Sequence, residues 1–219
     1  MDLIFIGTSG FAGLGIGVLI PEISNRIIDY KIEKNNMDMR RIDVPGKPIK
    51  IACCILNGLV WATAGFLMQD SMVALLISVL ITLAVLFALI DMRIQMIPNE
   101  LLLATLFLGL LFQFVYFGGR ALFIALVCML IMMVLFTLVG AFVGMDKVGA
   151  GDVKLAGVMG AVLGYPGIAW AALVMSLSFM VYSFMGILLK RVTLYSMLPF
   201  APFMMLGLVA SLGWILWVG

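Results

Sequence analysis

The sequence contains no histidine, three cysteines and few charged residues. Charged residues make up 11% of its 219 residues, whereas 65% are hydrophobic. A water-soluble surface needs considerably more charge, so this composition excludes a soluble globular domain. The missing histidine removes the commonest general base and the commonest metal ligand. The net charge of +2 is too small to indicate nucleic-acid binding.

The three cysteines have neither the spacing of a zinc site nor that of a disulfide framework. Cys53 and Cys54 are adjacent, and Cys128 lies inside a long apolar run. We interpret all three as small apolar side chains that pack between helices. The residue types therefore predict no metal site.

Apolar runs divide the chain into about eight segments that can cross a membrane, because a spanning helix needs about 20 apolar residues. The expected spans are residues 3–20, 50–69, 71–90, 100–117, 121–144, 153–165, 167–189 and 197–217. The sixth ends at a break formed by Gly164, Pro166 and Gly167. Seven helices with one re-entrant segment are the alternative. The predicted fold class is an all-α, polytopic membrane bundle, with residues 1–219 in one integral-membrane domain.

Lysine and arginine residues predict the orientation of this bundle. When the loop 21–49 is placed in the cytoplasm, segments 91–99, 145–152 and 190–196 fall on the same side. These segments and their immediate flanks contain twelve of the thirteen basic residues, and the opposite side contains Arg120. Because cytoplasmic loops are enriched in Lys and Arg, we expect both termini outside.

The loop 21–49 is the only sizeable stretch expected outside the membrane. Four isoleucines at helical spacing predict a short amphipathic helix that continues from the first span: Ile23, Ile27, Ile28 and Ile32. Asn35 and Asn36 are expected to end it. We interpret the loop as a solvated connector on the membrane surface. The alternative is that its acidic residues dock a basic peptide.

Two aspartates lie at the ends of apolar runs, where an ionisable side chain is costly unless it has a function. Asp91 follows the run 72–90, and Asp152 closes the turn Gly149-Ala150-Gly151-Asp152. The predicted topology places both at the cytoplasmic face. The simpler interpretations are that Asp91 pairs with Arg93 at the surface and that Asp152 caps the next helix.

A pair of carboxylates can perform chemistry without histidine or metal. Two carboxylates a few ångströms apart cannot both ionise readily, so they share a proton and titrate as a unit. The ionised member can accept a proton from water while the protonated member donates to the carbonyl oxygen of a peptide bond. Gly149 and Gly151 would allow unusual dihedral angles and close backbone approach beside Asp152. The alternative function is a transporter or proton-coupled carrier that uses the same acids.

Two proline-containing segments precede apolar runs. Pro98 and Asn99 stand before the run that starts at Leu101, where proline suits the first turn of a helix. Pro199 and Pro202 precede the last run and withhold amide donors there. The simpler interpretation is an ordinary helix start. We assign these four residues to the substrate-binding or active-site loops beside the aspartates.

These motifs together resemble the type IV leader peptidase family, the prepilin peptidases, which are membrane aspartic proteases. The shared motifs are Asp91 shortly before Ile97-Pro98-Asn99, the Gly149-to-Asp152 turn followed by Val-Lys-Leu, and Pro199-Phe200-Ala201-Pro202-Phe203. The resemblance implies Asp91 and Asp152 as the catalytic dyad, and Gly149 and Gly151 as glycines that let the second aspartate approach its partner. The presenilin and signal-peptide-peptidase group shares Gly-x-Gly-Asp, but its Tyr-Asp and Pro-Ala-Leu motifs are not matched here.

The resemblance also implies the substrate and its location. The substrate would be a prepilin or pseudopilin, with a short basic leader ending in glycine and then a hydrophobic helix that usually begins with phenylalanine and carries an early glutamate. Cleavage after the glycine would occur at the cytoplasmic face of the bacterial inner membrane. Membrane lipid is the other expected partner, nucleic acid is not expected, and proteolysis needs no cofactor.

One departure concerns the loop 21–49. Many bacterial members have a larger domain after the first helix, with two Cys-x-x-Cys pairs that bind zinc, and they N-methylate the new terminus with S-adenosylmethionine. The loop here is short and has no cysteine, so zinc is not expected. N-methylation stays open as a second activity that would require S-adenosylmethionine, because its site cannot be located from these residues.

Overall fold

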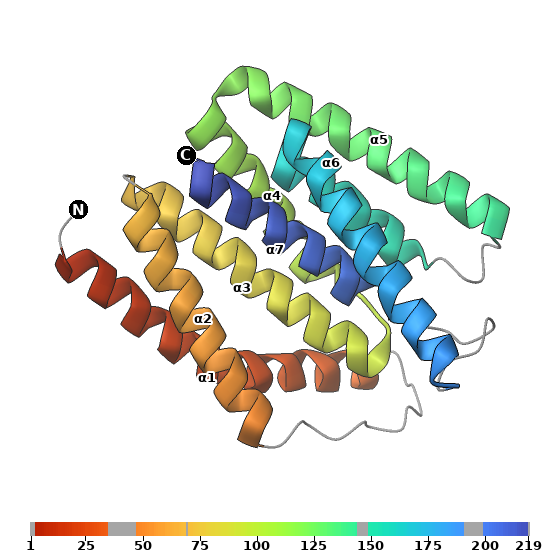
Figure 1. The fold of residues 1–219 in the computed structure, drawn as a ribbon, viewed down its shortest axis with the longest axis horizontal. Helices are drawn as coiled ribbons and strands as arrows, with labels where there is room; N and C mark the ends of the chain where they lie inside the picture. The colour runs from red at the N-terminus through yellow and green to blue at the C-terminus, as the bar shows by residue number, and fades with distance from the viewer. Residues whose placement is uncertain (1–2, 35–46, 69, 144–148, 191–198, 219) are drawn as a thin grey trace.

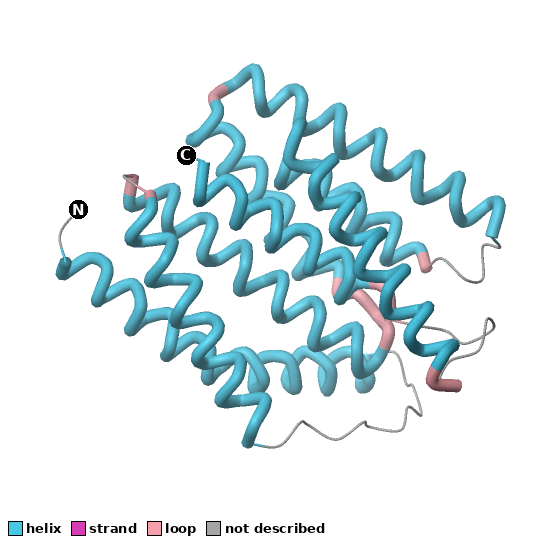
Figure 2. Tube along the Cα trace, viewed as in Figure 1, coloured by secondary structure: helices cyan, strands magenta, loops and turns pink. Residues whose placement is uncertain are grey.

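The chain folds into a bundle of α-helices. The computed structural model describes residues 3–34, 47–68, 70–143, 149–190 and 199–218 (Figure 1). Across these ranges the tube in Figure 2 shows helices joined by short connections, and no strand. The helices are α1 (Leu3–Lys34), α2 (Lys47–Leu67), α3 (Ser71–Ile94), α4 (Asn99–Phe117), α5 (Gly119–Val143), α6 (Ala150–Leu188) and α7 (Ala201–Val218). The predicted all-α bundle is confirmed.

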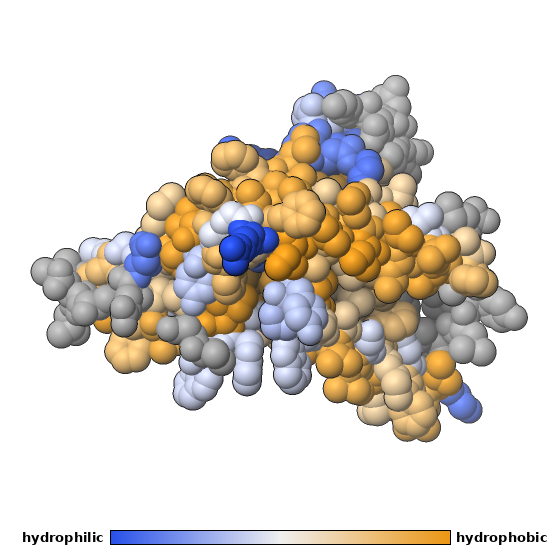
Figure 3. Space-filling model, turned by 90° about the horizontal axis from the view of Figure 1, so that it is seen from above, coloured by the Kyte–Doolittle hydropathy of each residue, from blue (hydrophilic) through white to orange (hydrophobic). Residues whose placement is uncertain are grey.

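The surface of this bundle is suited to lipid rather than to water. Six helices, α1 to α6, are long and apolar enough to cross a membrane, and Ala201–Trp217 is a shorter apolar helix. Large apolar side chains point outwards, among them Phe142, which is 89% exposed. The view in Figure 3 shows a largely hydrophobic surface with few hydrophilic patches. Apolar surface on this scale is stable where acyl chains cover it, so the protein is a multi-pass membrane protein.

Helix α6 contains the break that the sequence predicts. Gly164 (φ 55°, ψ −164°) and Tyr165 (φ −100°, ψ 139°) leave the helical conformation, and glycine adopts a positive φ at little cost. Beyond the break, Trp170 stacks on Trp214 near the end of α7. The second half of α6 therefore runs back along α7 in the antiparallel direction, and α6 provides two segments of the bundle (Figure 1).

The break also leaves a hollow at the end of the bundle away from the aspartates. Gly164 lies against the side chain of Gln113 in α4, and the Gln113 amide donates to the carbonyl of Val162 at 2.7 Å. The hollow has a volume of about 370 Å³, and its walls include Tyr116, Phe117, Trp170 and Trp214.

Helix α1 continues well beyond its first membrane segment. It runs without interruption to Lys34, which confirms the predicted helical continuation, and it changes direction between its two halves (Figure 1). Pro21 lies inside this helix, and proline is a common cause of a kink. Ile20 and Ile28 are buried against Leu86 and Ile90 of α3. Residues 21–34 are therefore more than a solvated connector: one face packs against α3, whereas Glu22, Arg26 and Glu33 on the other face are exposed. Asn35 and Asn36 lie outside the described residues.

Candidate active site

Asp91 lies in the last turn of α3 and is 4% exposed. Its Oδ2 accepts a hydrogen bond from the backbone N–H of Ala201, the first residue of α7, at 3.1 Å. The N-terminus of a helix carries a partial positive charge and suits a carboxylate. The expected surface pair with Arg93 is wrong, because Arg93 is itself buried and donates to Asn25 in α1 at 2.6 Å.

Asp152 is the third residue of α6 and is partly buried. Its Oδ2 accepts a hydrogen bond from the backbone N–H of Gly149 at 3.2 Å. The N-cap residue is Gly149. The simpler interpretation, that Asp152 is the N-cap, is therefore wrong, because Asp152 lies three residues later. Its carboxylate nevertheless satisfies one of the free amides at the start of α6, as the acidic residue of a capping box does.

The two carboxylates lie at the same end of the bundle, where Ile97, six residues after Asp91, lies against Gly151, the residue before Asp152. One comes from the last turn of a helix and the other from the first turn of another, 61 positions later in the chain. The structure therefore brings together the two acids that the sequence predicts as a pair. Among the described residues, no group of three His, Cys, Asp or Glu side chains could hold a metal ion.

The glycines before Asp152 differ from the prediction. Gly149 has an ordinary extended conformation (φ −66°, ψ 145°), and Gly151 has no positive φ. The predicted need for unusual dihedral angles is wrong, because α6 starts as a regular helix here. Close approach does apply to Gly151, where an added Cβ would lie 3.3 Å from the Cβ of Ile97. At Gly149 it would make only an ordinary contact, 3.4 Å from Asp152 Oδ2.

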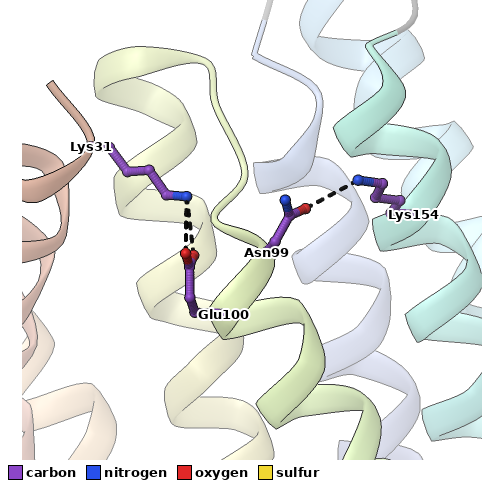
Figure 4. A network of polar contacts seen from close by, with 4 residues as sticks. All are labelled: Lys31, Asn99, Glu100 and Lys154. Atoms are coloured by element: carbon purple, nitrogen blue, oxygen red, sulfur yellow. Dashed lines mark hydrogen bonds and ion pairs between the residues drawn. The ribbon is translucent and has the colours of Figure 1, made fainter. Parts of the chain in front are cut away.

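Pro98 and Asn99 form the start of α4, next to the turn that carries Asp152. Pro98 is the buried N-cap residue, with φ −67°. The Lys154 ammonium donates to Asn99 Oδ1 at 3.1 Å, and Glu100 forms an ion pair with Lys31 of α1 at 3.1 Å (Figure 4). The start of α4 is thus bonded to α6 on one side and to α1 on the other.

Pro199 and Pro202 flank the residue that contacts Asp91. Pro199 precedes α7 and Pro202 is its second residue, so the expected helix start is confirmed. Pro202 has no N–H, which leaves the Ala201 amide as the donor that meets the carboxylate. Sequence reasoning did not identify Ala201. The sequence shows two amides between these prolines, those of Phe200 and Ala201, and gives no signal that distinguishes them.

The fold and the acidic pair define a polytopic membrane protein with two carboxylates at one end of a helical bundle. The model of the type IV leader peptidase family matches residues 74–218, about two thirds of the chain, including both aspartates. The chain belongs to this family. It is therefore a membrane peptidase that acts on a protein substrate. Searches among curated proteins and among solved structures gave no match.

Proposed function

We propose that the protein is an aspartic endopeptidase that removes the leader peptide of type IV prepilins or pseudopilins, with Asp91 and Asp152 as its catalytic dyad. The observation that carries this proposal is that the last turn of α3, with Asp91, and the first turn of α6, with Asp152, lie at the same end of the bundle, where Ile97, six residues after Asp91, lies against Gly151. Membership of the leader peptidase family supports the reaction. A carrier would need its acids on a path through the membrane, whereas both aspartates lie at helix ends.

The two carboxylates would divide the acid and base roles between them. Backbone amides of Ala201 and Gly149 each hold one oxygen of a carboxylate, which orients the second oxygen toward water and the peptide. The ionised carboxylate takes a proton from water as the water oxygen bonds to the carbonyl carbon, and the protonated one donates to the carbonyl oxygen. The C–N bond then breaks as the carboxyl group that took the proton from water gives it to the leaving nitrogen, while the other carboxylate takes back the proton from the hydroxyl on the carbonyl carbon.

The location of the reaction follows from the charge distribution. In the sequence, twelve of the thirteen basic residues fall in or beside the segments 21–49, 91–99, 145–152 and 190–196, which the predicted topology puts on the side of the two aspartates, so this side would face the cytoplasm of a bacterial inner membrane. A leader that ends in glycine would be cut there, with Pro98, Asn99, Pro199 and Pro202 around the dyad as contacts for the substrate. The proposed hydrolysis needs neither zinc nor another cofactor. No methyl-transfer step is proposed, because no described residue is assigned to S-adenosylmethionine.

The experiment compares three isosteric substitutions in the purified full-length protein with a prepilin substrate in detergent. Asp91→Asn and Asp152→Asn should each reduce cleavage roughly a thousandfold or more, because each removes a member of a unit that acts together. Asp70→Asn is the matched control: it lies on the same helix as Asp91, where it caps the other end through the N–H of Met72 at 2.8 Å. Asn caps helices as well as Asp, so this variant should cleave normally.

Mass spectrometry of the product completes the test. It gives the cut site, and a reaction with added S-adenosylmethionine shows whether a methyl group joins the new terminus. Wild-type cleavage rates in both Asp91→Asn and Asp152→Asn would refute the aspartic mechanism. If these variants also lost ion flux in vesicles, the carrier would become the better explanation.

A further inference from the structure

A second buried charge lies on another side of α3. Arg93 is two residues beyond Asp91, and successive helical residues are about 100° apart around the axis. Asp91 therefore faces α7, where Ala201 donates to it, while Arg93 faces α1, where its Nη1 donates to Asn25 Oδ1 at 2.6 Å. Arg93 is 9% exposed. A peptide bound at the aspartates would lie on the α7 side and not at this arginine.

The Arg93 guanidinium has polar neighbours in α1 and α2. Its Nη2 is buried and has no hydrogen-bond partner, and the same is true of the hydroxyl of Ser24, the residue before Asn25. Cys53 of α2 is buried and close enough to interact electrostatically with Arg93. Ser24, Asn25, Cys53 and Arg93, from three helices, are called the Arg93 cluster below.

The cluster has a charge but no counter-charge. A buried charge without a partner is costly, and a buried polar group without a hydrogen bond adds to that cost. Within the described part of the chain, no carboxylate forms an ion pair with Arg93. A buried guanidinium with an unpartnered Nη2 matches the oxygens of a phosphate, which Arg binds through its planar fork. The Ser24 hydroxyl, which is also unpartnered and belongs to the residue before Asn25, is a further donor on α1.

The position of the cluster suits a phosphate at the membrane surface. Arg93 lies in the last turn of α3, and Ser24 and Asn25 lie three and four residues after Pro21 in α1. Exposed Arg26 follows Asn25 on α1, and Lys47 and Lys50 lie in the first turn of α2. Basic pockets between membrane helices at the cytoplasmic side bind anionic lipid headgroups. We propose that the Arg93 cluster binds a phosphate group, with a phospholipid headgroup and free inorganic phosphate as the two sources to be separated.

The test measures thermal unfolding of the full-length protein in a neutral detergent by tryptophan fluorescence. Lysophosphatidylglycerol, monoolein (which has no phosphate) and sodium phosphate at matched ionic strength are titrated separately, and the shift in unfolding temperature gives an apparent affinity. Lysophosphatidylglycerol should stabilise the wild type more than monoolein does. An equal response to sodium phosphate identifies free phosphate as sufficient, and a response to the lysolipid alone identifies the headgroup.

Two variants and one control decide whether the cluster is the site. Arg93→Gln should weaken the apparent lysophosphatidylglycerol affinity at least about tenfold, because it removes a hydrogen bond from a charged donor. Ser24→Ala should weaken it about threefold, because it removes a hydrogen bond from a neutral donor. Arg26→Gln removes the same charge from an exposed position nearby and should change the affinity by less than about twofold.

The outcomes that overturn the proposal are equally specific. Unchanged affinity in Arg93→Gln and Ser24→Ala would exclude the cluster. If Arg26→Gln weakened the affinity as much as Arg93→Gln does, general attraction of the lipid to the positively charged surface would explain the response, and the cluster would not. If Arg93→Gln does not fold, Ser24→Ala decides alone, because removing an unpartnered hydroxyl should not harm the lipid-free protein. None of these measurements depends on peptidase activity.

Discussion

The α1–α2 pair and the α3–α7 bundle are held together in different ways. Helices α1 and α2 meet through glycines: a Cβ added at Gly13 would lie 2.6 Å from Trp61 Cβ, and one at Gly17 would lie 2.7 Å from Cys54 Cα. The α3–α7 bundle also has close glycine contacts, such as that of Gly207 with the Ala171 carbonyl, but it adds a core of large side chains: Phe87, Phe112, Met159, Met204 and Leu208. Both regions therefore use close backbone approach, and the second is in addition filled by large buried side chains.

The two regions also differ in what they carry. The family match begins at residue 74 in α3 and includes Asp91 and Asp152, while α1 and α2 lie outside it. The contacts of the first region with the second include the Asn25–Arg93 hydrogen bond and the Lys31–Glu100 ion pair. We infer that α3–α7 carries the chemistry and that α1–α2 supports it. Substitutions in the first region should then change stability, and those beside the aspartates should change turnover.

The largest expected effect is on the stability of the first region. Gly13→Ala should destabilise the protein by about 3 kcal/mol, because its Cβ would also meet the carbonyl oxygen of Asn57 at 2.9 Å and a packed interface cannot yield cheaply. Gly15→Ala is the control, since nothing lies within 4 Å of its Cβ and alanine gains up to about 1 kcal/mol in a helix. Thermal unfolding compares the two. A loss of cleavage by folded Gly13→Ala protein would contradict the division of roles.

Asn57→Ala should cost about 2 kcal/mol, because it removes two buried hydrogen bonds. The Asn57 amide donates to the carbonyl of Gly13 at 2.8 Å, and its oxygen accepts from the Thr82 hydroxyl at 2.8 Å. Thr63→Ala is the control, because this exposed hydroxyl bonds to Val60 of its own helix. Equal unfolding temperatures for the two variants would show that the buried bonds between α1, α2 and α3 do not stabilise the first region.

Gly151→Val should act on the second region and reduce cleavage about tenfold, which corresponds to about 1.4 kcal/mol. A branched side chain at this position cannot fit against Ile97 unless the turn that carries Asp152 shifts. Gly149→Ala should cleave within about twofold of wild type, since its Cβ fits at ordinary contact distance. Kinetic assays at equal folded concentration test this contrast. Normal cleavage by Gly151→Val would remove the role assigned to the close contact.

The smallest effect is expected for the ion pair between the two regions. Lys31→Met should change stability by less than about 1 kcal/mol, because the Glu100 side chain is 60% exposed and water screens the pair. Lys154→Met, which breaks a hydrogen bond within the second region, is the comparison. Unfolding at low and high salt should show a small salt dependence for wild type that Lys31→Met reduces. A cost of several kcal/mol would mean that α1 is anchored mainly by charge.

The sequence predicted the helices well because the length of an apolar run reflects the thickness of the bilayer. It was less accurate where a helix leaves the hydrocarbon. The expected span 71–90 extends to Ile94, so Asp91 lies inside α3 rather than after it. A helix can continue at the membrane surface with polar residues, so the end of an apolar run does not mark the end of the helix.

The site was predictable in its carboxylates but not in their partners. Asp91 and Asp152 were visible because ionisable residues at the ends of apolar runs are rare. The Ala201 amide was not, because every residue except proline has one, and this bond joins positions 110 apart. The Asn25–Arg93 bond, across 68 positions, was hidden for a similar reason. The catalytic role of Asp91 and Asp152 stays a prediction until the variants are assayed.

The break in α6 has a consequence for the membrane around the protein. Gly164 turns the chain back beside Gln113, four residues before α4 ends at Phe117, so this segment stops about 6 Å short of its neighbour. The hollow of about 370 Å³ at that end is the result. Acyl chains must curl into this depression, or the leaflet must become thinner above it, and either adjustment makes the energy of insertion sensitive to lipid chain length.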